Sequence, residues 1–277
     1  MSRECPVRIS QEPGLSRSSL VVGWSIDPGR LGWRTTGYLN RKLEGQEFAE
    51  IEPECFFALS GVAVKDDLAR FPASKFCACP QHDLVVFSSD YPEVEWHRFL
   101  NSVLDVAVQR CGMTELYIIG AMVSWSAHTD PRQLFTVVNS EHMKEALSGY
   151  DLMQDMDYQT PPGERPTLNA FLLWVARMRG IPAASLWVPI PFYLAGTGDA
   201  QAQREVLGFL DQRLDLKLDF DDLDEEVRAQ NQCLARARSD SAQIDDYIGR
   251  LESSLRLSDE ESAELVRRIE GLIRQGD

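Results

Sequence analysis

Short runs of apolar residues without alternation recur along the first two thirds of the chain. Such runs predict strands that are covered on both faces, because a half-exposed strand alternates apolar and polar positions. The central run, Leu116–Ile119, ends at Gly120 and opens into a polar turn that holds Trp125, His128 and Thr129. Other runs predict strands at residues 19–23, 54–60, 75–80, 83–88, 134–138 and 181–191.

Segments with apolar residues at helical spacing separate these runs. They predict helices at residues 33–43, from Pro92 onward, from Ser140 to Leu147, at about 167–179 before Gly180, and at 200–214. Strands and helices therefore alternate through residue 215. This order predicts an α/β fold with a mostly parallel sheet and helices on both faces.

The character of the sequence changes after this core. Residues 219–277 contain no strand-like run and no proline, and they carry many charges. An acidic run at 221–226 is typical of a solvated first helical turn, and Ser258 with Glu261 matches a capping box. We expect a flexible N-terminal arm (1–18), an α/β core domain (19–215) and a C-terminal helical hairpin (216–277). The apolar stripe of the hairpin must be covered by the core or by another subunit.

Net charge, the length of apolar segments and the cysteine pattern limit which partners and which cellular location we expect. The net charge is −15, which argues against a basic groove for nucleic acid. No segment has the apolar length needed to span a bilayer, and the first fifteen residues contain no apolar run of a signal peptide. We therefore expect a cytoplasmic protein with reduced cysteines. The one close pair, Cys77 and Cys79, lacks the second half of a zinc site, so we expect no metal, and we expect no cofactor.

Polar residues follow several of the predicted strands. In a parallel sheet these strand ends meet at one edge, so Asp27, Asp90, His128 and Tyr193 could form a catalytic cluster with His128 as the base. The alternative is that these side chains are packed and hydrogen-bonded and simply close the top of the sheet. The candidates for ligand binding are Gly23, Trp24, Gly29, Gly120, Trp125, Thr129 and Tyr193, with the two tryptophans as stacking walls.

Several short motifs occur in a fixed order through these loops. They are Gly23-Trp24 with Asp27 and Gly29, Pro92 with Trp96 and Phe99, Gly120 with His128-Thr129, Pro162-Gly163, Gly180 to Ala183, Ser185 to Trp187, Pro191 with Tyr193, and Tyr247-Ile248 with Leu251-Glu252. In this order and spacing, over roughly residues 19 to 275, they resemble the proteasome assembly chaperone 2 family of bacteria and archaea, also labelled ATP-grasp superfamily.

The resemblance implies a doubly wound, nucleoside-phosphorylase-like α/β domain with a helical C-terminal extension. It also implies homo-oligomers that are often trimers. The eukaryotic and archaeal relatives chaperone assembly of the proteasome core.

The sequence departs from the family pattern in several places. The family's Gly-Pro-Thr-Gly loop is here Thr160 to Gly163, and the last four residues, 274–277, lack the hydrophobic-Tyr-x tail that docks some assembly factors on proteasome rings. The family's Pro-His-Thr-Arg-Pro run is here Ala127 to Pro131 with Arg132 displaced, and its Pro-His-Tyr run is Pro191-Phe192-Tyr193. A ligand site that these residues form in relatives is therefore altered in this chain.

These observations lead to two functional hypotheses. The first is a chaperone-like, homo-oligomeric interaction protein, a trimer by the resemblance, that binds a protein client and has no clear catalytic machinery. The second is an enzyme or a binder of nucleosides or nucleotides that uses the cleft at the strand ends, with Asp27, Asp90 and His128 as its working groups. A third hypothesis is purely structural: the protein serves only to form the oligomer, without a client or a ligand.

Overall fold

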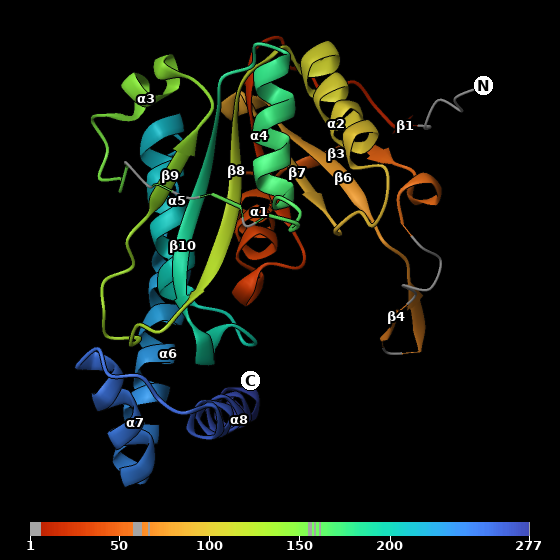
Figure 1. The fold of residues 1–277 in the computed structure, drawn as a ribbon. Coiled ribbons are helices and arrows are strands. Elements are labelled where there is room, and N and C mark those ends of the chain that lie inside the picture. Colours follow the sequence, from red (N-terminus) through yellow and green to blue (C-terminus); the bar gives the residue numbers. More distant parts are fainter. Residues whose placement is uncertain are drawn as a thin grey trace. The chain divides into compact units, whose positions relative to one another are not determined.

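The computed structural model describes residues 7–57, 63–65, 67–154, 157, 159–160 and 162–276, with the backbone alone for 63–65 and 274–276 (Figure 1). The chain divides into two compact units. Unit 1 comprises residues 1–26, 32–120 and 135–186, and unit 2 comprises residues 27–31, 121–134 and 187–277. The domain boundaries expected after residues 18 and 215 remain a prediction.

Eight strands of the described chain form one sheet, and two short ones form another. The order in the large sheet is β1 (Val7–Ile9), β3 (Gln46–Ile51), β6 (Ser74–Cys79), β7 (Leu84–Ser89), β2 (Ser18–Trp24), β8 (Met113–Ser124), β10 (Ala183–Pro191) and β9 (Phe135–Val138). Strands β4 (Ala63–Lys65) and β5 (Leu68–Arg70) pair separately. The later parts of β8 and β10 belong to unit 2.

The sheet is mixed, so the prediction of a mostly parallel sheet is wrong. Strand β2 pairs in parallel with β7 and β8, but the pairs β1–β3, β3–β6 and β6–β7 are antiparallel. The link between β6 and β7 is a single 3-10 turn, Pro80–His82, followed by Asp83. Parallel neighbours need a crossover of a dozen or more residues, so a link this short permits only an antiparallel hairpin.

Several short segments differ from the sequence prediction, and strands β4 and β5 are among those that it did not include. Residues 7–9, within the expected arm, form β1, and β3 was not predicted at all. A strand was expected at residues 54–60. The structure instead has a 3-10 turn at Pro53–Cys55, and residues 58–60 lie outside the described residues. Phe56 is nonetheless fully buried, with its ring 4.9 Å from that of Phe99. The apolar residues of this segment are therefore buried, but they follow a turn and do not form a strand.

Helices cover both faces of the sheet in unit 1. Helices α2 (Trp96–Cys111) and α4 (Leu168–Met178) lie side by side on one face, and α1 (Leu31–Lys42) lies on the other (Figure 1). The alternation of β2 explains this arrangement, because Leu20, Val22 and Trp24 join the apolar core beneath α2 and α4 while Gly23 points toward α1. A short helix, α3 (Glu141–Leu147), is capped by the Ser140 hydroxyl as predicted.

Unit 2 contains more helix than the sequence suggested. Its helices are α5 (Ala200–Leu214), α6 (Asp221–Asp240), α7 (Ala242–Glu252) and α8 (Asp259–Gly276), so α5 is followed by three helices instead of a two-helix hairpin. Ser241 separates α6 from α7, because its hydroxyl accepts from the Ile244 N–H and starts a new helix. As predicted, the acidic run forms the first turn of α6, and Ser258 and Glu261 exchange capping-box hydrogen bonds.

The apolar stripe of this tail is covered within unit 2. Helix α8 packs on α6, on α7 and on the 3-10 turn η5 (Phe192–Leu194). Ile248, Leu265 and Ile269 are fully buried, whereas Leu255 is exposed. No helix of the described chain is long and apolar enough to cross a membrane.

A substitution at Gly23 tests the packing of β2 on α1. A Cβ atom there would lie 2.3 Å from the Gly32 carbonyl oxygen, so Gly23→Ala must force strand and helix apart. We expect it to lower the free energy of unfolding by at least about 2 kcal/mol in urea denaturation. Gly37→Ala is the matched control, since nothing lies within 4 Å of its Cβ position. The control should raise stability by about 0.5–1 kcal/mol, and equal effects of the two variants would contradict the packing argument.

Candidate functional site

The polar segment that follows β8, residues 125–134, is called here the strand-end loop. Its shape is set by hydrogen bonds within the loop. The Asp130 carboxylate accepts from the Ala127 N–H at 2.9 Å, and the Arg132 guanidinium donates to the Asp130 carbonyl at 2.6 Å. Arg132 also donates to the Ala127 carbonyl at 3.4 Å, so one side chain closes the whole turn.

Arg132 forms a buried ion pair with Asp199. The Nε atom of Arg132 lies 2.7 Å from Oδ2 of Asp199, and the two side chains are 2% and 0% exposed. The other carboxylate oxygen of Asp199 caps α5 by accepting from the Ala202 N–H at 3.0 Å. Each charge therefore has its partner and further hydrogen bonds, which is what makes burial of an ion pair tolerable. The pair connects the strand-end loop to the start of α5.

His128 and Tyr193 form a second connection in unit 2. The Tyr193 hydroxyl accepts from the His128 backbone N–H at 2.6 Å and is hydrogen-bonded to Nδ1 of the same residue at 2.9 Å. Burial, and then the nearby charges of Arg132 and Arg238, lower the pKa of His128 to about 4. Burial also raises the pKa of Tyr193. Both groups are neutral at pH 7, and the imidazole is a weak base there.

Thr129 fastens the loop to α6 and α7. Its hydroxyl donates to Oε1 of Glu252 at 2.9 Å, and Glu252 in turn accepts two hydrogen bonds from Arg238, at 2.6 and 3.2 Å. The Arg238 hydrogen bond, which is the largest influence, lowers the pKa of Glu252 and keeps it ionised. Arg238 also donates to Asp245. The side chain of this candidate is thus engaged within unit 2.

Gly29 and Asp27 lie in another loop of unit 2. Gly29 has a left-handed backbone (φ 65°) and donates its N–H to the Ala195 carbonyl at 2.7 Å. A Cβ atom there would lie 3.1 Å from Cδ1 of Ile190 and 3.3 Å from Cα of Gly198. The glycine therefore permits close packing of two loops, and the Asp27 carbonyl accepts the Arg30 N–H within its own turn.

The unit 1 candidates are held inside unit 1. Trp24 is 3% exposed and donates its indole N–H to Oδ1 of Asn169 at 2.8 Å, so its ring belongs to the core and is no open stacking wall. Asp90 accepts from the Ser25 hydroxyl at 2.7 Å and from the Ala73 N–H at 3.0 Å. Gly120 lies inside strand β8.

The structure therefore joins only part of the expected cluster. His128 and Tyr193 are in direct contact, whereas Asp90 belongs to unit 1 and has its own partners. Sequence reasoning missed Asn169, Arg132 and Asp199. Asn169 carried a usable signal, since it is a lone amide in an apolar helix and had to find buried partners.

One part of the site faces outward as an apolar surface. Val123 is 55% exposed and Trp125 is 44% exposed, and the Trp125 ring lies 5.0 Å from that of Phe192. We call Val123, Trp125 and Phe192 the tryptophan patch.

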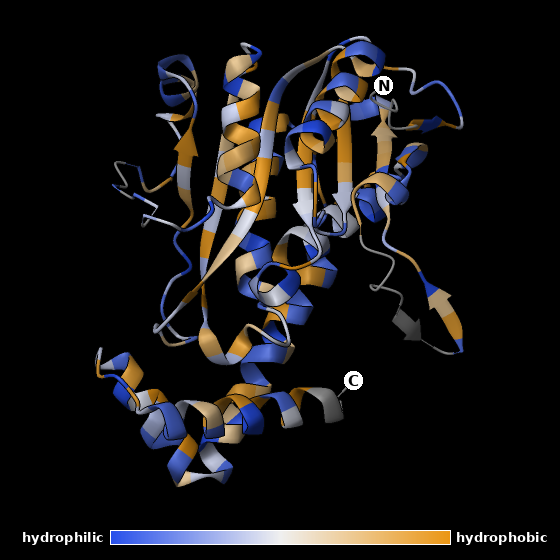
Figure 2. Cartoon of the chain, turned by 45° about the vertical axis from the view of Figure 1, so that its right-hand side comes forward, coloured by the Kyte–Doolittle hydropathy of each residue, from blue (hydrophilic) through white to orange (hydrophobic). Residues whose placement is uncertain are grey.

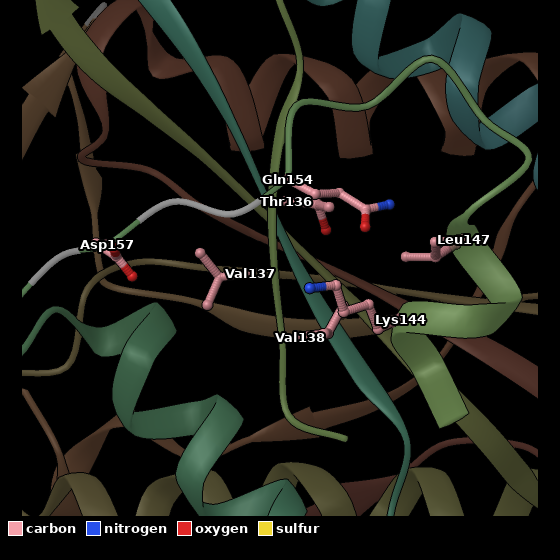
Figure 3. A pocket seen from close by; sticks show the side chains of 7 residues that line it. All are labelled: Thr136, Val137, Val138, Lys144, Leu147, Gln154 and Asp157. Carbon is pink, nitrogen blue, oxygen red and sulfur yellow. The ribbon is translucent and has the colours of Figure 1, made fainter. Parts of the chain in front are cut away.

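A separate pocket of about 260 Å³ lies in unit 1, beside the edge strand β9 (Figure 3). The side chains of β9 meet those of α3 there, and no residue predicted from the sequence lines it. Its lining residues are Thr136, Val137, Val138, Lys144, Leu147, Gln154 and Asp157.

The described residues hold no cluster of three histidine, cysteine or acidic side chains that could bind a metal ion. Burial raises the pKa of Cys77 to about 11 and that of Cys79 to about 12, so both thiols stay protonated at neutral pH. A protonated thiol is a poor metal ligand.

Removal of one buried charge tests the ion pair. Arg132→Met leaves the Asp199 carboxylate buried without its partner, and we expect a loss of about 3–5 kcal/mol of stability in urea denaturation. Lys75→Met is the control, because it breaks an exposed ion pair with Glu47. The control should cost less than about 1 kcal/mol, and a similarly small loss for Arg132→Met would contradict the proposed role.

The lowered pKa of His128 makes stability depend on pH. The unfolded chain takes up a proton near pH 6.5 and the folded chain only near pH 4, so this contribution is complete above 6.5 and is lost as the pH falls toward 4. His128→Asn, which keeps an acceptor, should flatten the stability profile between these values in denaturant titrations. His142→Asn, a change of an exposed histidine on α3, should leave the slope in place.

Comparison with known proteins assigns the chain to a family. The model of the PAC2 family matches residues 20–238. No curated protein matches the sequence. Among solved structures, the fold is similar to the Pyrococcus furiosus archaeal proteasome activator PbaB, with 19% identity, a TM-score of 0.68, and coverage of 85% of this chain and 99% of that one.

Two Mycobacterium tuberculosis structures are also similar. One is a proteasome-assembly chaperone homologue, with 18% identity, a TM-score of 0.67, and coverage of 84% of this chain and 99% of that one. The other is a protein of unknown function, with 16% identity, a TM-score of 0.75, and coverage of 100% of this chain and 98% of that one. At these identities the likeness shows the fold. The resemblance to proteasome assembly chaperones is confirmed at the level of the family, the additional ATP-grasp label is not supported, and the chain belongs to the PAC2 family.

Proposed function

We propose that this chain is a chaperone-like interaction protein that binds a protein client. The observation that carries the proposal is the family match over residues 20–238. Two structural neighbours, PbaB and PbaA of Pyrococcus furiosus, are described as a proteasome activator and as a homologue of a proteasome-assembly chaperone. The client class that these relatives suggest is a proteasome-like subunit. Self-association and a cytoplasmic location belong to the same proposal, and the family resemblance favours a trimer.

The tryptophan patch is the surface that we assign to the client. Exposed tryptophan is enriched among the residues that dominate protein–protein binding energy, and an apolar surface on a firmly held loop suits that role. The strand-end loop is held in place by the contacts of Arg132, His128 and Thr129 with Asp199, Tyr193 and Glu252, respectively. Little conformational entropy is then lost when a client covers Trp125.

The alternative is a nucleoside or nucleotide site that uses Asp27, Asp90 and His128. His128 is neutral at pH 7 and bonded to Tyr193, and Asp90 is bonded to Ser25 and Ala73, so these groups act first as structural partners. The alternative remains a prediction, and calorimetry against a panel of nucleosides and nucleotides tests it.

Capture of partners from native cells tests the proposal. The tagged full-length chain should enrich proteasome-like subunits, quantified by mass spectrometry. Trp125→Glu should lower this enrichment at least about tenfold, because loss of a central aromatic contact costs about 2 kcal/mol. Leu255→Glu, a change of an exposed residue at the end of α7, is the matched control and should retain it. A wild-type preparation that contains only the chain itself would overturn the chaperone proposal.

A further inference from the structure

The edge of the large sheet in unit 1 carries a small pocket that the proposed client surface does not use. We call the pocket of Figure 3 the β9 pocket, because strand β9 and helix α3 supply most of its lining. In Figure 2, β9 is mainly orange and α3 is mainly blue, so an apolar strand lies beside a largely polar helix there. The volume of about 260 Å³ is below the range of about 300–1,000 Å³ that is typical of ligand pockets, so the pocket admits only a small molecule.

A buried hydroxyl group lies at the base of the β9 pocket. Thr136 is 7% exposed, and no group of the described chain forms a hydrogen bond with its Oγ1 atom. Its backbone N–H donates to the Met153 carbonyl at 3.0 Å, so the position of the residue is fixed. A buried hydroxyl group is costly when it makes no hydrogen bond, and most such groups in folded proteins have a partner. We therefore expect the acceptor for Thr136 to come from a bound molecule.

Two further side chains with hydrogen-bond donors line the pocket. Figure 3 shows Lys144 and Gln154 on the same side of β9 as Thr136. Val137 and Asp157 lie on the other side of the strand in this view. An ammonium group has three N–H donors and no acceptor, so Lys144 can bind a ligand oxygen in addition to the contact that it already makes. The Gln154 amide supplies two more N–H donors, and this side of the pocket therefore suits an anion whose oxygens accept hydrogen bonds.

Apolar side chains complete the lining on this side. Val138 lies on the same face of β9 as Thr136, because side chains alternate along a strand. Leu147, from the last turn of α3, is fully buried. Neither side chain can form a hydrogen bond, but both favour contact with an alkyl chain. The pocket thus combines donors for an anionic group with an apolar wall for a short hydrocarbon chain.

We propose that the β9 pocket binds a short-chain aliphatic monocarboxylate. The Thr136 hydroxyl and the Lys144 ammonium group donate to the carboxylate oxygens, and the alkyl chain packs on Val138 and Leu147. A local positive charge is needed because the whole chain carries a net charge of −15 and repels anions. The site is independent of the client surface, since the tryptophan patch belongs to unit 2 and the lining of the β9 pocket belongs to unit 1.

Titration of the full-length chain with sodium butyrate at constant ionic strength, followed by saturation-transfer NMR, tests the proposal. We expect a dissociation constant of about 0.1–1 mM, which is reasonable for so small a ligand. Acetate and inorganic phosphate should each bind at least about tenfold more weakly, because fewer methylene groups or none are buried. Butylamine, which has the opposite charge, should not bind. Binding of butylamine, equal affinity for acetate or phosphate and butyrate, or no binding of butyrate would each overturn the proposal.

Two substitutions test which residues bind the carboxylate. Thr136→Val keeps nearly the same shape but removes the hydroxyl, and Lys144→Met removes the ammonium group. Each should weaken butyrate binding at least about tenfold, because a hydrogen bond to a charged group is lost. Lys75→Met is the matched control, since it removes the same charge from an exposed position elsewhere in unit 1, and it should leave the affinity unchanged.

The stability of the variants without ligand separates binding from packing. The urea midpoint of Thr136→Val should equal or exceed that of the wild type, since the hydroxyl that it removes has no partner in the described chain. A marked loss of stability would show that the folded chain itself uses the hydroxyl, and would overturn its role in the pocket. Unchanged butyrate affinity in both Thr136→Val and Lys144→Met would likewise overturn the assignment of the site.

Discussion

The buried ion pair between Arg132 and Asp199 is the contact on which the strand-end region depends. A guanidinium and a carboxylate that are both withdrawn from water cost several kcal/mol unless each satisfies the other and its remaining hydrogen-bonding groups. Here the remaining groups are the carbonyls of residues 127 and 130 and the first turn of α5. The turn after β8 and the start of α5 are therefore fixed together, and neither can move without exposing a charge to an apolar interior.

The polar residues of the strand-end loop act as structural partners in this arrangement. A histidine after a strand at the sheet edge is where a catalytic base is expected, yet His128 is hydrogen-bonded to a buried tyrosine and stays neutral. Thr129 likewise turns toward Glu252. The side chains of His128 and Thr129 are hydrogen-bonded to other residues of unit 2. The exposed surface of the loop is therefore formed by Trp125 and its apolar neighbours. A loop with this division is better suited to holding a protein surface than to moving protons.

Much of the fold could be predicted from the sequence because the signals were local. The apolar runs of β2, β7 and β10, the Ser140 cap and the Ser258–Glu261 capping box all depend on residues a few positions apart. Strand β3 escaped notice because its sequence, Gln-Glu-Phe-Ala-Glu-Ile, alternates poorly, and its apolar residues are recognised only in the folded sheet. The strand directions were misjudged although a signal existed, since the link from β6 to β7 is too short for a parallel crossover. The site was less predictable, because Arg132 and Asp199 are far apart in sequence and no local pattern indicates that they pair.

The mixed sheet also has a consequence for how the chain folds. Antiparallel strands β6 and β7 can pair as soon as their short turn closes, whereas β2 must wait for distant partners: Ser19 pairs with Leu84, and Leu20 pairs with Leu116. Pairing between such distant segments is slow, because the loop between them must close before any contact stabilises it. During synthesis the apolar segment Leu20–Val22 therefore emerges long before its neighbours exist. The centre of the sheet is therefore uncovered while the chain is being made, and exposed apolar segments of this kind promote aggregation in folding intermediates.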